Sequence, residues 1–417
     1  MSTIVAYSNM HAIPFASEFF MTRRFILDGR QHLAAHELIF RRDAEGSRGM
    51  AAVLADAMQH GLARIICGPA TYLQVDAEAL MSELMQDMPS EHVVLSIVES
   101  TPAAPDLIER IALLAQSGFK FALDASSDSQ GMRALLPFAD TLKIDIRGKT
   151  PEQLGSLCRS FKPHGRKLLA QGVDSIEQFE LCAAFGFDYF QGAYFVKPQI
   201  LEGKKLSPSQ VAITELMSLI ESDADNAEIE RSIKSNVALG LNLLRLADMP
   251  AISLHRIGSL HQALAVVGRD QLQRWLRIML DMDAGSDAHR MMPLLMLAAT
   301  RGRLMELTAK RLMPGNRGIA DTAFMVGIMS LMDAVFCMPM TQILGQIPVI
   351  DEASDALLQR KGYFGILLML AEYTERLDKD KENLAQLAHG LRLSPNDLYL
   401  LQLAAFEWSD EVSRNLH

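Results

Sequence analysis

Residues 119–146 read FKFALDASSDSQGMRALLPFADTLKIDI, and this stretch decides the fold class. It begins with a short β-type run, Phe119–Asp124, and ends with a second one, Thr141–Ile146, with a helix-like segment between them. Short apolar strands that alternate with helical segments are typical of parallel βαβ units. The stretch therefore predicts an α/β architecture for this part of the chain.

The same alternation extends in both directions over the first 200 residues or so. The other β-type runs are Ala34–Phe40, Ala63–Cys67, Val93–Val98, Lys167–Ala170 and Asp188–Gln191. Thr150-Pro151, with Gln153 two residues on, has the form of a helix start with a capping box. Units repeating every 20 to 30 residues suit a TIM-like (β/α) barrel. A doubly wound open sheet is the structural alternative, because periodicity does not decide whether the sheet closes.

The character of the chain changes near Gln199–Gln210. Beyond this point no convincing β-type run follows, and apolar residues recur at helical spacing, as in Ile233, Val237, Leu241 and Leu244. We therefore expect two domains, an α/β barrel in residues 1–200 and an all-helical domain in residues 201–417.

Composition and charge narrow the partners and the compartment. The chain has 50 Asp and Glu against 40 Lys and Arg, a formal charge of −10, which disfavours nucleic acid and anionic membranes as partners. No apolar run reaches the ~20 residues of a membrane span, because Asp333 interrupts the longest one at 324–340. No secretory signal starts the chain, and its 4 cysteines form no CxxC. A cytoplasmic protein is expected.

Polar residues near the expected strand ends are the candidates for function, since barrel active sites lie in the loops that follow the strands. They are Glu37, Arg41, Cys67, Ser96, Glu99, Asp124, Ala125, Lys143, Asp145, Gln171 and Gln191. By themselves they form a mixed set, and ordinary strand ends and loop caps are the alternative interpretation.

Five segments in order resemble the EAL family of bacterial phosphodiesterases, which linearise cyclic di-GMP. The segments are HELIFR (36–41), LD (123–124), LKID (142–145), LAQGVD (169–174) and DYFQGAYF (188–195). The resemblance covers residues 20–200 and implies a (β/α) barrel.

The second half is similar to the HDOD family, helical relatives of HD phosphohydrolases that lack the metal-binding His-Asp pair. The segments that carry this resemblance are IKSNVALGLNLLRLADM (233–249) and IGSLHQALAVVGR (257–269). The EAL–HDOD order is that of a bacterial signalling family, so the resemblance implies a regulator linked to motility, biofilm or cyclic-di-GMP circuits.

Departures from the EAL pattern predict that the barrel is inactive. The resemblance implies two divalent metals, which need hard oxygen ligands and activate a water. The retained family positions are Glu37, Asp124, Lys143, Asp145 and Gln191, and the changed positions are Cys67, Ser96, Ala125 and Gln171. Gln171 replaces a glutamate, and Gln cannot accept a proton at neutral pH. We therefore expect no metal and no cofactor, and interpret the retained Glu37, Asp124, Lys143 and Asp145 as a salt-bridged network at the barrel mouth.

Ligand binding without cleavage is a separate question. Arg41 matches the family arginine that faces a phosphate, and it belongs to a basic cluster with Arg23, Arg24, Arg30 and Arg42. A solvated charged surface is the alternative interpretation of this cluster.

The leading prediction is a non-enzymatic signalling protein whose barrel and HDOD-like domain form a protein-interaction platform for partners that the sequence does not identify. The alternatives are a cyclic-di-GMP receptor that binds without hydrolysis and, disfavoured by Ser96, Ala125 and Gln171, an active phosphodiesterase. A methionine cluster in residues 291–340 is interpreted as mostly core, and any exposed members would suit an adaptable interaction surface. The oligomeric state stays open.

Overall fold

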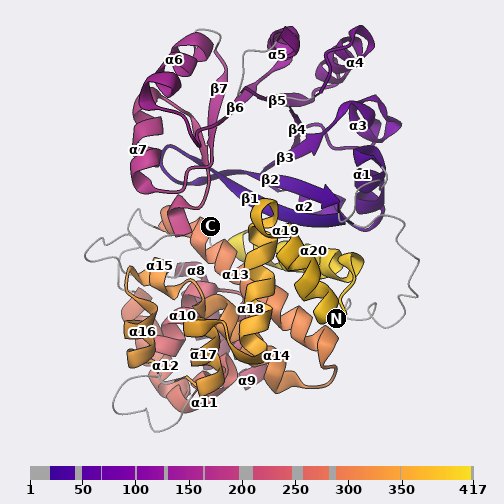
Figure 1. Cartoon of the computed structure of the whole chain (residues 1–417). Coiled ribbons are helices and arrows are strands. Elements are labelled where there is room, and N and C mark those ends of the chain that lie inside the picture. Colours follow the sequence, from indigo (N-terminus) through magenta and orange to yellow (C-terminus); the bar gives the residue numbers. More distant parts are fainter. Residues whose placement is uncertain are drawn as a thin grey trace.

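The fold has a barrel half and a helical half, which lie against each other (Figure 1). The computed structural model describes residues 19–42, 49–66, 68–98, 101–125, 130–162, 165–196, 210–246, 257–280, 288–347 and 349–414. The expected boundary at residue 200 lies outside these residues and stays a prediction. The last described barrel residue is Val196, and the first helix of the second half begins at Gln210.

The first half is a closed barrel, in which β8 pairs with β1. The strands are β1 (Phe19–Asp28), β2 (Leu33–Arg42), β3 (Ala70–Val75), β4 (Val93–Ile97), β5 (Lys120–Asp124), β6 (Thr141–Asp145), β7 (Lys167–Gln171) and β8 (Tyr189–Gln191). Strand β1 is antiparallel to both neighbours, and the other pairs are parallel. The TIM-like barrel is thus confirmed, and the open-sheet alternative is wrong.

Two strands differ from the sequence-based expectation. Residues 63–67 were expected to be a strand, but Ala63–Ile66 is the short helix α2, and Cys67 lies outside the described residues. The buried side chains there are Leu62, Ile65 and Ile66, a spacing of three and four residues that suits a helix. The strand in this region, β3, begins later, at Ala70. Strand β1 was missed because polar residues, Thr22 to Arg24, interrupt its apolar run.

Helices cover the outside of the barrel. They are α1 (Met50–Gln59), α2, α3 (Ala77–Met81), α4 (Pro105–Gln116), α5 (Gln130–Leu135), α6 (Pro151–Phe161) and α7 (Ile176–Phe185), with the 3-10 turns η1 (Glu83–Gln86), η2 (Leu136–Phe138) and η4 (Tyr194–Val196). The expected capping box at α6 is present: the Thr150 side chain accepts from the Gln153 amide, and the Gln153 side chain accepts from the Thr150 amide. The capping box fixes the start of α6 at Pro151, shortly after β6 ends at Asp145, and so keeps the loop that follows β6 short.

The second half is helical, as expected. Its helices are α8 (Gln210–Glu221), α9 (Asn226–Lys234), α10 (Val237–Leu246), α11 (Leu260–Val267), α12 (Arg269–Leu280), α13 (Ala288–Leu312), α14 (Arg317–Met329), α15 (Met332–Phe336), α16 (Met340–Gln346), α17 (Asp351–Gln359), α18 (Gly362–Glu375), α19 (Leu377–Gly390) and α20 (Pro395–Arg414). Among the described residues of this half, one isolated bridge, Ile257 to Val349, is the sole β-type contact.

The core of the helical half is built on α13 and α14. These helices approach closely at Gly302 and Gly327, where a Cβ on Gly327 would lie 2.5 Å from the Gly302 Cα. The methionines are mostly core, as expected: Met292, Met296, Met305, Met325, Met329 and Met332 are buried. The apolar stretch at 324–340 thus forms interior helices, and no helix within the described ranges is long and apolar enough to cross a bilayer.

The helical half packs on the barrel mainly through α20, α18 and α19, which lie over β1 and β2 (Figure 1). The Tyr399 hydroxyl donates to the Ala57 carbonyl at 3.0 Å, and the Gln402 amide donates to the Met21 carbonyl at 2.8 Å. Apolar side chains of both halves, among them Phe19 and Tyr399, belong to one buried cluster. The two halves therefore share a core.

Candidate functional site

The carboxyl ends of the parallel strands form the mouth of the barrel, where loops carry function in this fold class. Asp124, Gln171 and Gln191 are the last residues of β5, β7 and β8, and Lys143 lies on β6. They surround a cavity of about 610 Å³, within the ~300–1,000 Å³ range of small-molecule pockets. Of the predicted site residues, the cavity lining includes Glu37, Arg41, Asp124, Lys143, Gln171 and Gln191.

The Lys143 ammonium is the centre of this site. Its Nζ donates to Glu37 Oε1 at 2.7 Å and to Ser96 Oγ at 2.8 Å, and it forms an ion pair with Asp124 Oδ1 at 3.3 Å. Burial alone would lower the pKa of Lys143, but the charges of Glu37 and Asp124 raise it above its ordinary value. The side chains of Lys143 and Glu37 are 5% and 2% exposed, so the pair is both buried and ionised.

Two glutamines complete the surroundings of Glu37. The Gln191 amide donates to Glu37 Oε2 at 2.8 Å, and the Gln171 amide donates to Gln191 Oε1 at 3.0 Å. Burial raises the pKa of Glu37, while the charge and hydrogen bond of Lys143 and the hydrogen bond of Gln191 lower it to a net value below normal. Both carboxylate oxygens of Glu37 are thus already engaged by protein donors.

Asp145 and Ala125 lie apart from this network. Asp145 pairs with Arg147, whose Nη2 is 2.6 Å from Asp145 Oδ2. Burial raises the pKa of Asp145, and the hydrogen bonds from Arg147 lower it by more. Ala125 is fully buried, and its amide donates to the Lys143 carbonyl at 2.8 Å. The predicted network therefore joins Glu37, Asp124 and Lys143, but Asp145 forms its own pair.

The residues present do not fit the two divalent metals that the EAL resemblance implies. Glu37 and Asp124 are the carboxylates that face the centre of the mouth, and both are paired with the Lys143 ammonium. Two carboxylates bring too little negative charge to hold two adjacent dications. Within the described residues, no group of three or more His, Cys, Asp or Glu could hold a metal ion. Ser96 and Gln171 add no negative charge.

On β3, the residue that lines the cavity is Gln74. Gln74 lies opposite Ser96 of β4 in the parallel register, one strand away from Glu37. Its side-chain oxygen accepts from Arg41 Nη1 at 2.8 Å, so it orients the arginine that the sequence singled out. Gln74 was not among the predicted site residues because the strand was expected seven residues too early, at Ala63–Cys67.

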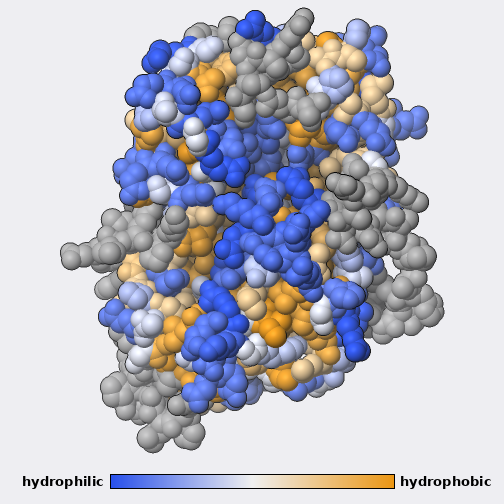
Figure 2. Space-filling model, in the orientation of Figure 1, coloured by the Kyte–Doolittle hydropathy of each residue, from blue (hydrophilic) through white to orange (hydrophobic). Residues whose placement is uncertain are grey.

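The helical half supplies the other wall of the cavity. Nine cationic side chains line the cavity: Arg23, Arg24, Arg41, Lys143, Arg147, Arg301, Arg360, Arg376 and Lys379. Six carboxylates line it: Glu37, Asp124, Asp174, Glu372, Glu375 and Asp378. The lining is therefore net positive in a chain whose formal charge is −10. Figure 2 shows hydrophilic residues gathered across the junction of the two halves.

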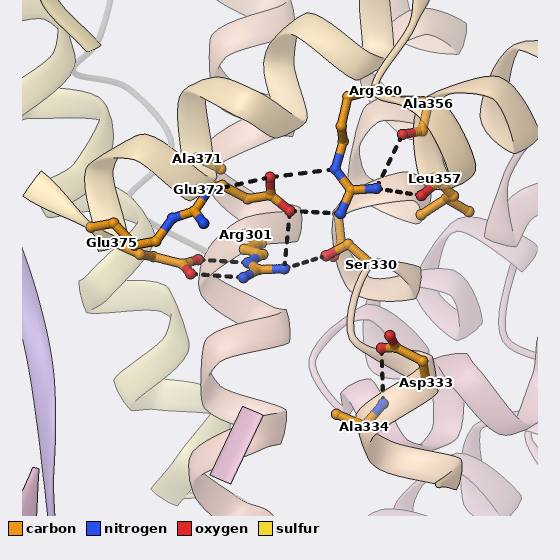
Figure 3. A network of polar contacts seen from close by, with 12 residues as sticks. Arg301, Ser330, Asp333, Ala334, Ala356, Leu357, Arg360, Ala371, Glu372 and Glu375 are labelled. Atoms are coloured by element: carbon orange, nitrogen blue, oxygen red, sulfur yellow. Dashed lines mark hydrogen bonds and ion pairs between the residues drawn. The ribbon is translucent and has the colours of Figure 1, made fainter. Parts of the chain in front are cut away.

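Most charges of the helical wall neutralise one another (Figure 3). Arg301 on α13 donates to Glu375 from Nε at 2.6 Å and from Nη2 at 2.7 Å, and to Ser330 at 3.0 Å. Arg360 donates from Nη2 to Glu372 Oε1 at 2.8 Å. Local sequence patterns gave no sign of this wall, because its residues lie more than 100 positions beyond the barrel strands.

One carboxylate of the helical wall reaches the barrel. Asp378, in the first turn of α19, accepts from Arg41 Nε at 3.1 Å and pairs with Arg41 Nη2 at 2.9 Å. Its second oxygen contacts the Arg24 guanidinium. Burial raises the pKa of Asp378, and the charges of Arg24 and Arg41 lower it by more. The predicted phosphate-facing arginine is thus already paired with a carboxylate of the same chain.

The comparisons with known proteins agree with this description of the barrel. The family model described as EAL domain matches residues 70–198. The chain is 27% identical over 418 residues to the cyclic di-GMP phosphodiesterase CdgJ of Vibrio cholerae, covering 95% of this chain and 93% of that protein. It is 24% identical over 405 residues to the uncharacterized protein YuxH of Bacillus subtilis, covering 93% and 97%.

Solved structures of EAL proteins are also similar. A standalone EAL protein of Vibrio cholerae in its c-di-GMP-bound form has 18% identity and a TM-score of 0.36, covering 44% of this chain and 93% of that chain. An EAL domain protein of Listeria monocytogenes has 17% identity and a TM-score of 0.33, covering 43% and 87%. The EAL domain match of this chain is thus to its barrel, and its residues run from β3 through β8.

Proposed function

We propose that this chain is a non-enzymatic signalling protein whose barrel does not hydrolyse cyclic di-GMP. The observation that carries the proposal is the shortage of carboxylates at the mouth: Glu37 and Asp124 remain, but Ser96 and Ala125 supply no charged oxygen ligand for a second metal ion. Gln171, bonded to Gln191, offers no base for a water. The EAL domain is degenerate in this proposal.

Hydrolysis is tested directly. Purified full-length protein is incubated with cyclic di-GMP and Mg²⁺ or Mn²⁺, and the products are separated by chromatography. We expect no linear dinucleotide above the level of a protein-free control. The relative from Vibrio cholerae is named a phosphodiesterase, so the assay includes an active EAL enzyme as positive control. Formation of linear product by this chain would refute the proposal.

The role we propose in place of catalysis is a protein-interaction platform in cyclic-di-GMP-linked regulation of motility or biofilm, in the cytoplasm, with an HDOD domain as the helical half. The support is the resemblance of residues 233–269 together with the packing of this half against the barrel. Because Tyr399 and Phe19 are in contact across the junction, partner capture is done with the full chain rather than with an isolated half. If the proposal is correct, the folded chain retains specific partner proteins, and a heat-unfolded sample of the same chain does not.

The cavity favours a second candidate, a cyclic-di-GMP receptor that binds without hydrolysis. Its volume and its excess of cationic side chains suit an anionic ligand of nucleotide size. Isothermal titration of the full chain with cyclic di-GMP in EDTA tests this reading. Saturable heat at micromolar protein supports a receptor. Its absence would exclude the receptor and leave the interaction platform as the proposed function.

A further inference from the structure

We propose that the Asp378 carboxylate occupies the anion position formed by Arg24 and Arg41, so that a phosphodiester ligand of the cavity binds by displacing it. The inference rests on the receptor function proposed above and concerns how the helical half controls that site. A cyclic dinucleotide would then compete with the Asp378 carboxylate for the two arginines.

The geometry is that of an anion held between two guanidinium groups. Asp378 Oδ1 is 2.9 Å from Arg41 Nη2 and 3.1 Å from Arg41 Nε, while Oδ2 contacts Arg24. A phosphate diester presents two unesterified oxygens in the same way, and arginine binds both kinds of anion through paired donors. Gln74 accepts from the remaining Arg41 Nη1 at 2.8 Å and so holds this edge toward the cavity.

Asp378 differs from the other carboxylates of the helical wall. Glu372 and Glu375 are committed to Arg360 and Arg301 within their own half. Among the described carboxylates that line the cavity, Asp378 stands out by its ion pairs across the junction, with Arg24 and Arg41. The three side chains are each about one-third exposed, at 29% for Arg24, 34% for Arg41 and 31% for Asp378, so a ligand can reach them.

Packing holds α19 on the barrel independently of the charge of Asp378. The preceding residue, Leu377, is fully buried in a cluster that includes Phe20 of β1 and Leu384 of α19. Removing the charge of Asp378 therefore leaves α19 docked on the barrel. When a ligand takes the arginine pair, the ion pairs between α19 and the barrel are lost, and the helical half can respond to occupancy.

The test compares cyclic di-GMP affinity of the full-length chain and of Asp378→Asn by isothermal titration calorimetry in EDTA. Freeing the arginines raises the fraction of binding-competent sites, and we expect at least a ~5-fold lower Kd for Asp378→Asn. Asp378→Ser, a second variant, should behave alike. Glu382→Gln makes the same charge change at an exposed position of α19, outside the cavity lining, and should stay within ~2-fold of wild type. Thermal unfolding verifies that each variant is folded.

Three results would overturn the inference: an unchanged or weaker affinity in Asp378→Asn and Asp378→Ser, an equal gain in Glu382→Gln, or no heat from any variant. The hydrolysis assay with Mg²⁺ decides separately whether the barrel is inactive. Linear product from the wild type would refute inactivity, yet the affinity ratio measured in EDTA would still support or overturn the competition by Asp378.

Discussion

A single ammonium group dominates the chemistry of the barrel mouth. Lys143 engages Glu37, Ser96 and Asp124 at once. Burial raises the pKa of Glu37, and the charge and hydrogen bond of Lys143 help to lower it to a net value below normal. Charges buried in this way are costly to leave unpaired, which makes the network a structural element.

Lys143→Met should lower the free energy of unfolding by ~3–5 kcal/mol, because it leaves the buried Glu37 carboxylate without its cation. Urea unfolding measures the loss. Lys167→Met is the matched control: Lys167 pairs with Asp188 at 3.2 Å, but its side chain is 57% exposed, so we expect a loss below ~1 kcal/mol. Equal losses in the two variants would contradict the structural role of Lys143.

The double variant Glu37→Gln with Lys143→Met removes both charges of the pair. It should recover part of the stability lost in Lys143→Met, because the buried Glu37 side chain then carries no unpaired charge. A double variant less stable than Lys143→Met would show that the cost comes from packing rather than from charge.

At the scale of elements, three helices of the second half are joined by a second charged cluster. Lys234 of α9 pairs with Glu230 at 3.2 Å, with Asp321 of α14 at 2.8 Å and with Glu306 of α13 at 3.9 Å. Burial raises the pKa of Glu306, and the charges of Arg303 and Lys234 lower it to a net value below its ordinary 4.5. One lysine thus ties α9 to the pair of helices at the centre of this half.

Lys234→Met should cost ~3 kcal/mol of unfolding free energy at pH 7, because three carboxylates lose a shared cation. Carboxylates with depressed pKa values contribute stability above their unfolded pKa and lose it as the pH falls through the folded pKa. Without Lys234 the pKa of Glu306 rises. The difference in unfolding free energy between wild type and Lys234→Met should therefore shrink as the pH falls through 4.5.

Chemical unfolding at a series of pH values measures this difference. Lys310→Met removes another partner of the same carboxylate, at 2.8 Å, but Lys310 is 49% exposed, and its loss should stay below ~1 kcal/mol. A pH-independent difference for Lys234→Met would contradict the electrostatic account.

At the scale of the whole molecule, the helical half is a wall of the barrel mouth rather than an independent module. Arg23 of β1 crosses the junction: its guanidinium donates to Asp410 at 2.6 Å and to Ser409 at 2.7 Å, and lies 4.4 Å from the Phe406 ring centroid. Together with the shared apolar cluster, these contacts predict that wild type unfolds in one transition.

Arg23→Leu should destabilise the chain by ~2–4 kcal/mol and broaden or split the transition, because it leaves Asp410 partly buried without its cation. Far-UV circular dichroism during urea unfolding measures both effects. Arg64→Leu breaks a contact to Glu407 of the same helix at 3.5 Å, but Arg64 is 65% exposed, so its effect should be below ~1 kcal/mol. An unchanged transition in Arg23→Leu would indicate that apolar packing alone couples the halves.

Local patterns in the chain predicted the α/β architecture, the helical second half and most of the mouth, but closure of the sheet became evident only from the pairing of β8 with β1. Glu37, Lys143, Gln171 and Gln191 could be found because each is a polar residue within or at the end of an apolar strand. The same patterns misplaced β3, because a short apolar run such as Leu62, Ile65 and Ile66 is compatible with a strand as well as with a helix. They missed β1 because polar residues interrupt its apolar run.

Long-range packing alone established that the mouth has a second wall. Asp378 lies 337 positions from Arg41, and no local pattern relates them. Their ion pair exists because apolar residues such as Leu377 and Phe20 dock α19 on β1. Burial of apolar surface is non-directional, so the spacing of apolar residues along the chain does not predict which helix packs on which strand. The residues of the site thus follow from the chain, but their partners follow from how its two halves pack.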